Sequence, residues 1–363
     1  MKNWFLSFLF LASSVFSSKA FAYPEMIRQH YVNCLACHES PTGGGLLNAY
    51  GRGISAELLS TWGGAKEARP FYGAVDQPFL KNWFNIGGDL RAVQFHNKNS
   101  QSTEDKFIRM QTGIETSLKY QKVKFVSFFG KQEAGNTVKG EFLRFFLQYQ
   151  AMEELTIRAG RFIPNFGVNI AEHILATRRG LGFDEGSERD QVEAMWSGEK
   201  WNSSISYSKQ VKSDEIPQIE KAANAQINYS FFDSYKVGGD LWIGDLEGQS
   251  RQIIGAHALL GFTKKFYYLT EFDLQKGFDK KSGLFHFSKL GYEFIKGVHA
   301  VILEDYQKSD LNDGLTLANS YGAGMEWYPR PHFEFEGIWS KKRVAIQSSE
   351  YADYAYLMMH YYF

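Results

Sequence analysis

The sequence predicts an all-β fold, a 16-stranded antiparallel β-barrel of the outer-membrane type, with a small helical segment at its N-terminal end. Three observations predict the barrel. From Trp83 onward, apolar and polar residues alternate with a period of two, which is typical of half-exposed strands. The connections between successive candidate strands alternate between long and short. The last candidate strand is apolar at every second position and ends on Phe363.

Residues 1–22 are predicted to be a signal peptide that is removed on export. Lys2 is followed by the apolar run Trp4–Leu11, and Ala20-Phe21-Ala22 supplies a small-x-small cleavage site, which is the pattern of a secretory signal. We therefore expect the mature chain to begin near Tyr23. An anchor helix is the weaker alternative, because the apolar run is shorter than the roughly 20 residues that span a bilayer.

The segment 23–82 carries the chain's only two cysteines, Cys34 and Cys37, and His38 follows directly. The pattern C-x-x-C-H is typical of covalent c-type haem attachment. Both thiols would form thioethers to the haem, and His38 would be the proximal ligand of its iron. A structural zinc site needs about four ligands, and no second cysteine pair supplies the rest. An exported C-x-x-C pair without haem would oxidise, so a disulfide is the remaining alternative.

The second axial ligand of the iron stays open between Met26, His30 and His173. A methionine ligand would raise the haem potential relative to a histidine. His173 lies in the long connection 164–189, which also holds Arg178 and Arg179, candidate partners of the haem propionates. The alternatives are simpler: the methionine packs in a small core, the histidines are solvated, and the arginines line a pore.

Composition narrows the class of protein. The formal net charge is zero, which gives no argument for binding nucleic acid. The chain holds 31 Phe, 20 Tyr and 8 Trp, but no apolar stretch after the signal reaches the length of a membrane-spanning helix, so a membrane role requires strands. No nucleophile and base at diagnostic spacing, phosphate loop or repeat is present. We therefore do not expect a hydrolase or a transferase.

Alternation alone does not separate a soluble sandwich, with its apolar face inward, from a membrane barrel, with its apolar face toward lipid and a polar lumen. Phe333 and Phe335 share one face of their strand, and Glu334 and Glu336 share the other. In the segment 284–293, His286 and Lys289 fall in opposite phases, so its faces stay unassigned. Sixteen candidate strands are expected near residues 83–95, 107–120, 122–131, 139–150, 154–163, 190–198, 200–209, 222–231, 234–243, 250–262, 265–274, 284–293, 296–306, 318–328, 331–341 and 351–363.

The lengths of the connections favour the barrel. Long connections are expected at 96–106, 164–189, 210–221 and 307–317, and short ones at 121, 198–199, 232–233, 264 and 329–330. An even number of strands with short periplasmic turns and longer external loops is typical of outer-membrane barrels. The terminal Phe363 resembles the end of such barrels. Period two also places Arg158 opposite Leu155 and Ile157, so we expect it in the lumen, lining a wet channel or tuning its selectivity.

The N-terminal segment is expected to plug the barrel or cap its periplasmic mouth. About 60 residues between the signal and residue 83 are few for a domain with its own core. Short helices are predicted over 24–31, after Pro24, and over 46–52, after the glycine run 43–45, on the usual start signals. A 16-stranded barrel has a lumen wide enough to take such a segment.

In the order of signal, haem motif and barrel, the chain resembles the fused outer-membrane cytochrome-porins known from iron-oxidising bacteria. The local likeness consists of the motif at 34–38, then Pro41, then L-N-A-Y-G-R at 47–52, which is similar to the family's L-N-x-F-G-R with Tyr50 in place of Phe. The insertion Thr42-Gly43-Gly44-Gly45 departs from the family's pattern and leaves the subgroup and the electron donor open.

The resemblance implies one covalent haem c in the outer membrane. It implies electron transfer between an extracellular donor, such as ferrous iron, and a periplasmic c-type cytochrome or other carrier, and in that sense an electron-transfer protein or Fe(II) oxidase. The competing hypothesis is a solute porin whose N-terminal segment plugs or regulates the pore. Commitment of both cysteines and His38 to one motif favours electron transfer, because a passive porin needs no cofactor.

Overall fold

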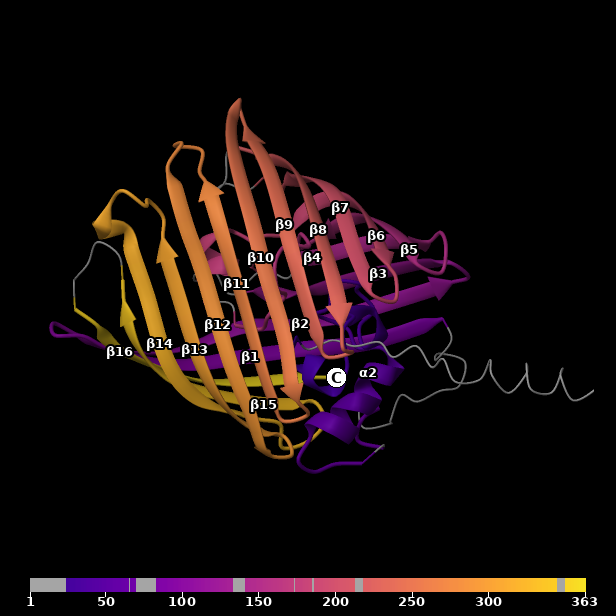
Figure 1. The fold of residues 1–363 in the computed structure, drawn as a ribbon. Coiled ribbons are helices and arrows are strands. Elements are labelled where there is room, and N and C mark those ends of the chain that lie inside the picture. The colour runs from indigo at the N-terminus through magenta and orange to yellow at the C-terminus, as the bar shows by residue number, and fades with distance from the viewer. Residues whose placement is uncertain are drawn as a thin grey trace, which may run out of the picture.

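The computed structural model describes residues 24–64, 66–69, 83–132, 141–172, 174–184, 186–212, 218–344 and 350–363. Within these residues, sixteen strands form one closed antiparallel barrel in which every strand pairs with its neighbours in sequence and β1 pairs with β16 (Figure 1). The strands are β1 Phe84–Lys98, β2 Thr103–Tyr120, β3 Val123–Gln132, β4 Glu141–Gln150, β5 Leu155–Phe162, β6 Arg189–Ser197, β7 Trp201–Gln210, β8 Lys221–Phe231, β9 Tyr235–Leu246, β10 Gln249–Thr263, β11 Phe266–Lys276, β12 Ser282–Ile295, β13 Val298–Lys308, β14 Leu317–Trp327, β15 Phe333–Arg343 and β16 Ala352–Tyr362.

The predicted all-β class, strand number and barrel are confirmed, with strand ends that differ by a few residues. One predicted connection is wrong: 96–106 is mostly strand, because β1 continues to Lys98 and β2 begins at Thr103. Polar residues in this stretch suggested a loop, but strands that extend past the membrane can be polar. The predicted signal peptide 1–22 and the boundary at 82/83 lie outside the described residues.

The barrel wall is apolar outside and polar inside, the inverse of a soluble protein. In β8, Asn224, Gln226 and Asn228 are buried on the luminal face, whereas Ile227 between them is half exposed on the outer face. Near the short turns, rings of the outer face contact one another around the wall; Tyr229, Phe231, Tyr235, Phe262 and Phe266 form such a series. Aromatic girdles of this kind mark the membrane interfaces of outer-membrane barrels.

Two segments fill the lumen. One is the N-terminal segment, whose short helices lie at the end of the barrel that carries the short turns (Figure 1). The other is the connection 163–188, which folds inward and buries Val168, Ile170 and Leu175 against wall residues and against Ile27. The helices are η1 Pro24–Gln29, η2 Cys34–Ala36, α2 Ala49–Ile54, η3 Ser55–Leu59, η5 Ala176–Gly180 and η6 Gly314–Thr316. Within the described residues, no helix is long and apolar enough to cross a membrane.

Candidate cofactor site

The C-x-x-C-H motif forms one tight turn inside the barrel. The backbone amides of Cys37 and His38 both donate to the carbonyl of Cys34, each at 3.2 Å. Asn48 holds this turn from the next helix, because its Nδ2 donates to Ala36 O at 2.6 Å while its Oδ1 accepts from Gly51 N at 2.9 Å. The L-N-A-Y-G-R stretch therefore packs on the motif, and its asparagine begins α2 as the N-cap.

The glycine run between the motif and α2 crosses close to the first cysteine. Gly43, Gly44 and Gly45 have φ values of 78°, 71° and 61°, a conformation that strongly favours glycine. A Cβ on Gly43 would lie 3.3 Å from Cys34 Sγ, and one on Gly45 would lie 2.3 Å from a carboxylate oxygen of Glu115. The insertion thus brings the loop into contact with both the thiol and the barrel wall.

His38 is oriented by the backbone of this loop. Its Nδ1 lies 3.2 Å from Gly45 O, a distance that suits a hydrogen bond with the proton on Nδ1. Nε2 then carries the lone pair that an iron ligand needs, the usual arrangement of a metal-binding histidine. The donor set of the motif therefore fits the proximal side of a c-type haem.

A cavity beside His38 is lined by aromatic, cationic and acidic side chains. Its volume is about 150 Å³, and it is partly open to solvent. Its apolar wall includes Phe146, Phe162 and Phe166, which suit the face of a macrocycle. Its cationic side chains are Arg91, Arg144 and Arg178, and guanidinium groups pair well with carboxylates such as propionates.

Cys34 lines an adjoining cavity, and Thr42 and Asn169 line both. Burial raises the pKa of the Cys34 thiol. Redox-active C-x-x-C motifs instead rely on a lowered thiol pKa. Cys34 therefore lacks the lowered thiol pKa of such motifs.

The candidates for the second axial ligand lie elsewhere. Met26 is buried in an apolar cluster with Ile54, Leu59 and Tyr328, as the simpler alternative proposed. His30 is exposed, with φ of 71° after η1. Neither side chain lines the cavity beside His38. His173 lies outside the described residues.

Of the predicted arginines, two contact this region and one does not. Arg178 is buried, lines the cavity, and donates to Phe166 O at 3.0 Å, whereas Arg179 is exposed. Arg158 faces the lumen as predicted. It does not line a wet channel, however, because it is 1% exposed and pairs with Glu193 at 2.7 Å.

Arg158 also contacts the motif loop, since its guanidinium lies 3.2 Å from Ser40 Oγ and 3.4 Å from Thr42 Oγ1. It thereby ties the loop that follows His38 to the wall of the barrel. The sequence analysis missed His360, which lines the cavity beside His38. Its Nδ1 lies 2.9 Å from Glu334, and its Nε2 lies 3.2 Å from Asp89.

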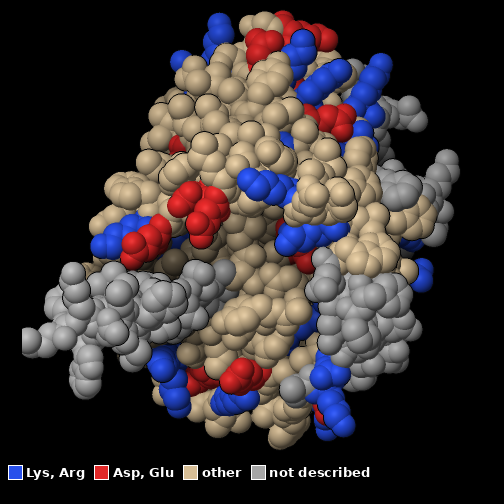
Figure 2. Space-filling view, turned by 90° about the vertical axis from the view of Figure 1, so that its right-hand side faces the viewer, with Lys and Arg blue, Asp and Glu red and all other residues tan. Residues whose placement is uncertain are grey.

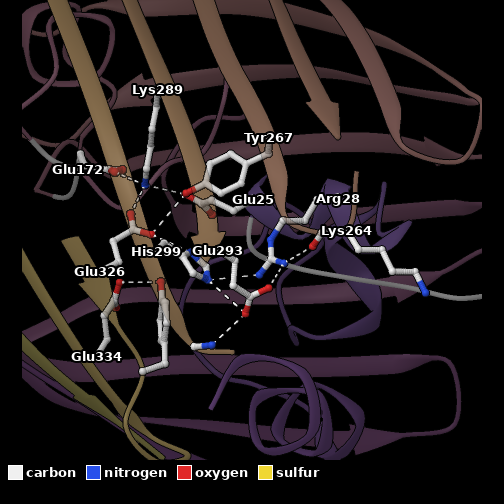
Figure 3. Close-up of polar contacts among 12 residues, drawn as sticks. Glu25, Arg28, Glu172, Lys264, Tyr267, Lys289, Glu293, His299, Glu326 and Glu334 are labelled. Carbon is white, nitrogen blue, oxygen red and sulfur yellow. Dashed lines mark hydrogen bonds and ion pairs between the residues drawn. The ribbon is translucent and has the colours of Figure 1, made fainter. Parts of the chain in front are cut away.

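The N-terminal segment and the inward connection meet at one buried lysine on β12 (Figure 3). Lys289 Nζ lies 2.8 Å from Glu25 of the N-terminal segment and 2.5 Å from Glu326 of β14, and it also pairs with Glu172 of the inward connection. An ammonium group has three hydrogens to donate, so three carboxylates can share it. Lys289 therefore joins the plug, the inward connection and the wall.

A second buried ion pair holds the end of η1. Arg28 Nη1 lies 2.6 Å from Glu293 and 2.5 Å from Lys264 O on the β10–β11 turn, and Nη2 lies 3.3 Å from His299 (Figure 3). Because the partners sit at a short turn, these contacts fix the N-terminal segment at the short-turn end of the lumen.

This fold defines a closed 16-stranded barrel of the outer-membrane porin class, with its lumen filled by two segments. Among solved structures, it is similar to the anion-selective porin from Comamonas acidovorans, at 12% identity and a TM-score of 0.60 over 77% of this chain and 99% of that one. It is also similar to the outer membrane channel DcaP of Acinetobacter baumannii, at 12% identity and a TM-score of 0.57 over 77% and 97%. A loop-deletion mutant of OmpT of Vibrio cholerae matches at 9% and 0.59 over 77% and 99%.

The sequence matches no protein-family model and no curated protein. The structural likenesses show the porin fold. They agree with the barrel part of the resemblance to cytochrome-porins and give no evidence for its cytochrome part. The cytochrome part depends on the N-terminal sequence motif and stays a prediction.

Proposed function

We propose that this chain is an outer-membrane electron-transfer protein in which Cys34 and Cys37 hold one haem c and His38 binds its iron. The observation that carries the proposal is the placement of the motif turn inside the barrel, against a cavity with aromatic and arginine walls. When bound, the haem supplies one-electron chemistry. The protein positions His38 through Gly45 O and holds the following loop through Arg158.

The closed lumen supports passage of electrons rather than solutes. Ile27 of η1, Val168 and Leu175 of the inward connection, and Phe287 and Leu303 of the wall belong to one buried apolar cluster across the lumen. Hydrophobic constrictions exclude water and ions. Electron transfer needs no open path, whereas this cluster narrows the path that is left for solutes.

The proposed location is the bacterial outer membrane, with the short turns toward the periplasm. This orientation places the N-terminal segment at the periplasmic end, where a c-type cytochrome or other carrier would exchange electrons with it. An extracellular donor such as ferrous iron would act from the opposite end. On the side at the right of Figure 1, positive and negative side chains intermix (Figure 2), so no single charge sign on that face selects the partner.

The test is the visible spectrum of the protein made in a host that matures c-type cytochromes. We expect sharp reduced bands that survive acid–acetone extraction, and their loss in Cys34→Ala/Cys37→Ala. The electrophoretic mobility of unheated samples reports whether the variant barrel still folds. A colourless, folded wild-type protein from a maturation-competent host would rule out the haem proposal.

The second candidate function is a solute channel, which the similarity to porins and channels favours. Its test is the conductance of the purified chain in a planar bilayer. Electron transfer through a closed lumen predicts little steady conductance. Stable open steps comparable to those of general porins would favour the channel.

A further inference from the structure

The inward connection is held to the barrel wall by two luminal carboxylates. Asp240 on β9 accepts from Gly167 N at 2.9 Å, and Glu271 on β11 accepts from Val168 N at 2.7 Å. Gly167 has a φ of 61°, a conformation that favours glycine. The backbone at this point therefore directs two successive amides at the wall, and these hydrogen bonds hold residues 166–168 against β9–β11.

A third carboxyl group, that of Asp273, is buried at the same place without a donor. Its side chain is 0% exposed and is in contact with the carboxyl group of Glu271. Within the described residues, no hydrogen-bond donor reaches either oxygen of Asp273 or Oε1 of Glu271. Two buried carboxylates in contact repel each other. One proton held between them removes this conflict, because a protonated carboxyl group donates to its neighbour.

The charged groups around Glu271 and Asp273, which we call the carboxyl pair, fit one shared proton. Both ring nitrogens of His257 on β10 lie 2.7 Å from oxygen acceptors, one of them on Asp240. This arrangement suits an imidazolium that balances Asp240. Arg178 of the inward connection is the other cation near Asp273, and the residues of β12 opposite the carboxyl pair are phenylalanines. One negative charge on the pair matches one arginine, whereas two would exceed it.

The inward connection covers the carboxyl pair. Gly255 on β10 pairs with Asp240 on one side and with Asp273 on the other, and it has no side chain to separate the two carboxyl groups. Phe166 lies over this glycine, since a Cβ there would be 3.4 Å from the Phe166 ring. Neither member of the carboxyl pair lines either cavity described above. Hydration of the pair therefore requires residues 166–168 to move away.

We propose that the carboxyl pair makes closure of the inward connection depend on pH. The pair shares one proton while residues 166–168 lie against the wall. When that proton passes to water, both groups are ionised, and they separate into water that enters beneath the segment. The closed state holds one proton more than the open state, so its equilibrium constant falls by up to about tenfold per pH unit. This inference does not depend on the haem.

The test is hydrogen exchange of the full chain in detergent micelles, read by mass spectrometry of peptides that cover residues 163–172. After correction for intrinsic exchange rates, we expect protection in the wild type to be at least about tenfold lower at pH 9 than at pH 6. Asp273→Asn and Glu271→Gln each supply an amide donor without a titrating proton, so both variants should stay protected. The electrophoretic mobility of unheated samples reports whether each variant folds.

Two controls separate the carboxyl pair from other titrating groups. Asp245→Asn changes an exposed position on the strand of Asp240 and should keep the wild-type response. Glu172→Gln removes the carboxyl group beside Lys289 and should still lose protection as the pH rises. Equal protection of the wild type at both pH values, or a response that persists in both amide variants, would overturn the proposal. A response abolished by Glu172→Gln would assign it to the lysine cluster instead and would also overturn the proposal.

Discussion

Lys289→Met removes the ammonium group at which the plug, the inward connection and the barrel wall meet. Its three partners, Glu25, Glu172 and Glu326, are all buried. With every group ionised, the cluster carries a formal charge of −2 in the wild type and −3 in the variant. Methionine keeps most of the aliphatic stem, so the change is mainly electrostatic.

The expected magnitude follows from burial. Removing one partner of a buried ion pair costs about 3–5 kcal/mol, because the other charge is left uncompensated. Here three carboxylates lose their common cation, so we expect the free energy of unfolding to fall by about 5 kcal/mol. Since a typical domain has about 5–15 kcal/mol of stability, the plug and the inward connection should loosen before the barrel unfolds.

Two assays measure this change. Guanidinium unfolding in detergent micelles, followed by tryptophan fluorescence, gives the lost stability, and planar-bilayer conductance reports whether the lumen opens. Lys265→Met on an exposed turn is the control and should change neither. Lys289→Met/Glu172→Gln should recover part of the loss, since it removes one stranded charge. The reasoning would be wrong if the free energy of unfolding of Lys289→Met lay within about 1 kcal/mol of wild type and its conductance were unchanged.

Three further predictions concern the lumen. Arg28→Leu, which leaves Glu293 with His299 and the amide of Gly297 as partners, should cost about 1–3 kcal/mol and make the N-terminal segment sensitive to protease while the barrel stays folded. Burial raises the pKa of Glu172 above its ordinary value, so its contribution to stability is complete at low pH and is lost as the pH rises through the raised pKa. Unfolding at pH 5 and pH 8 measures this change, and Glu172→Gln should flatten it. Gly45→Ala should lower covalent haem incorporation, because Gly45 has a φ of 61° and its Cβ would displace the Glu115 carboxylate that accepts from Leu46 N, whereas a Cβ on Gly53 would meet nothing within 4 Å; haem staining of denaturing gels compares them.

The strands could be predicted because their signal is local. Period two requires only neighbouring residues, which is why the barrel and the luminal side of Arg158 were found from the sequence. The motif at Cys34, Cys37 and His38 is likewise contiguous. In β12, by contrast, His286 and Lys289 fall in opposite phases, and hydropathy could not show that Lys289 faces three luminal carboxylates while His286 faces outward.

The remaining site residues could not be predicted, because barrel closure brings them together. Arg91, Arg144 and His360 lie on β1, β4 and β16, far apart in the chain, and they line one cavity only once the sheet has closed. Alternation along each strand predicts that these side chains face the lumen, but dozens of other residues face the lumen too.

The seam at which the barrel closes adjoins the plug. The amides of Gly88 and Phe363 donate to each other's carbonyls at 3.2 and 3.1 Å, and Arg52 of α2 donates to Ile86 O and Asn85 Oδ1 on the same first strand. The last strand therefore completes the wall around a segment that precedes the first strand. These contacts couple the closing seam to the N-terminal segment, so docking of that segment stabilises the strand pair that closes the barrel.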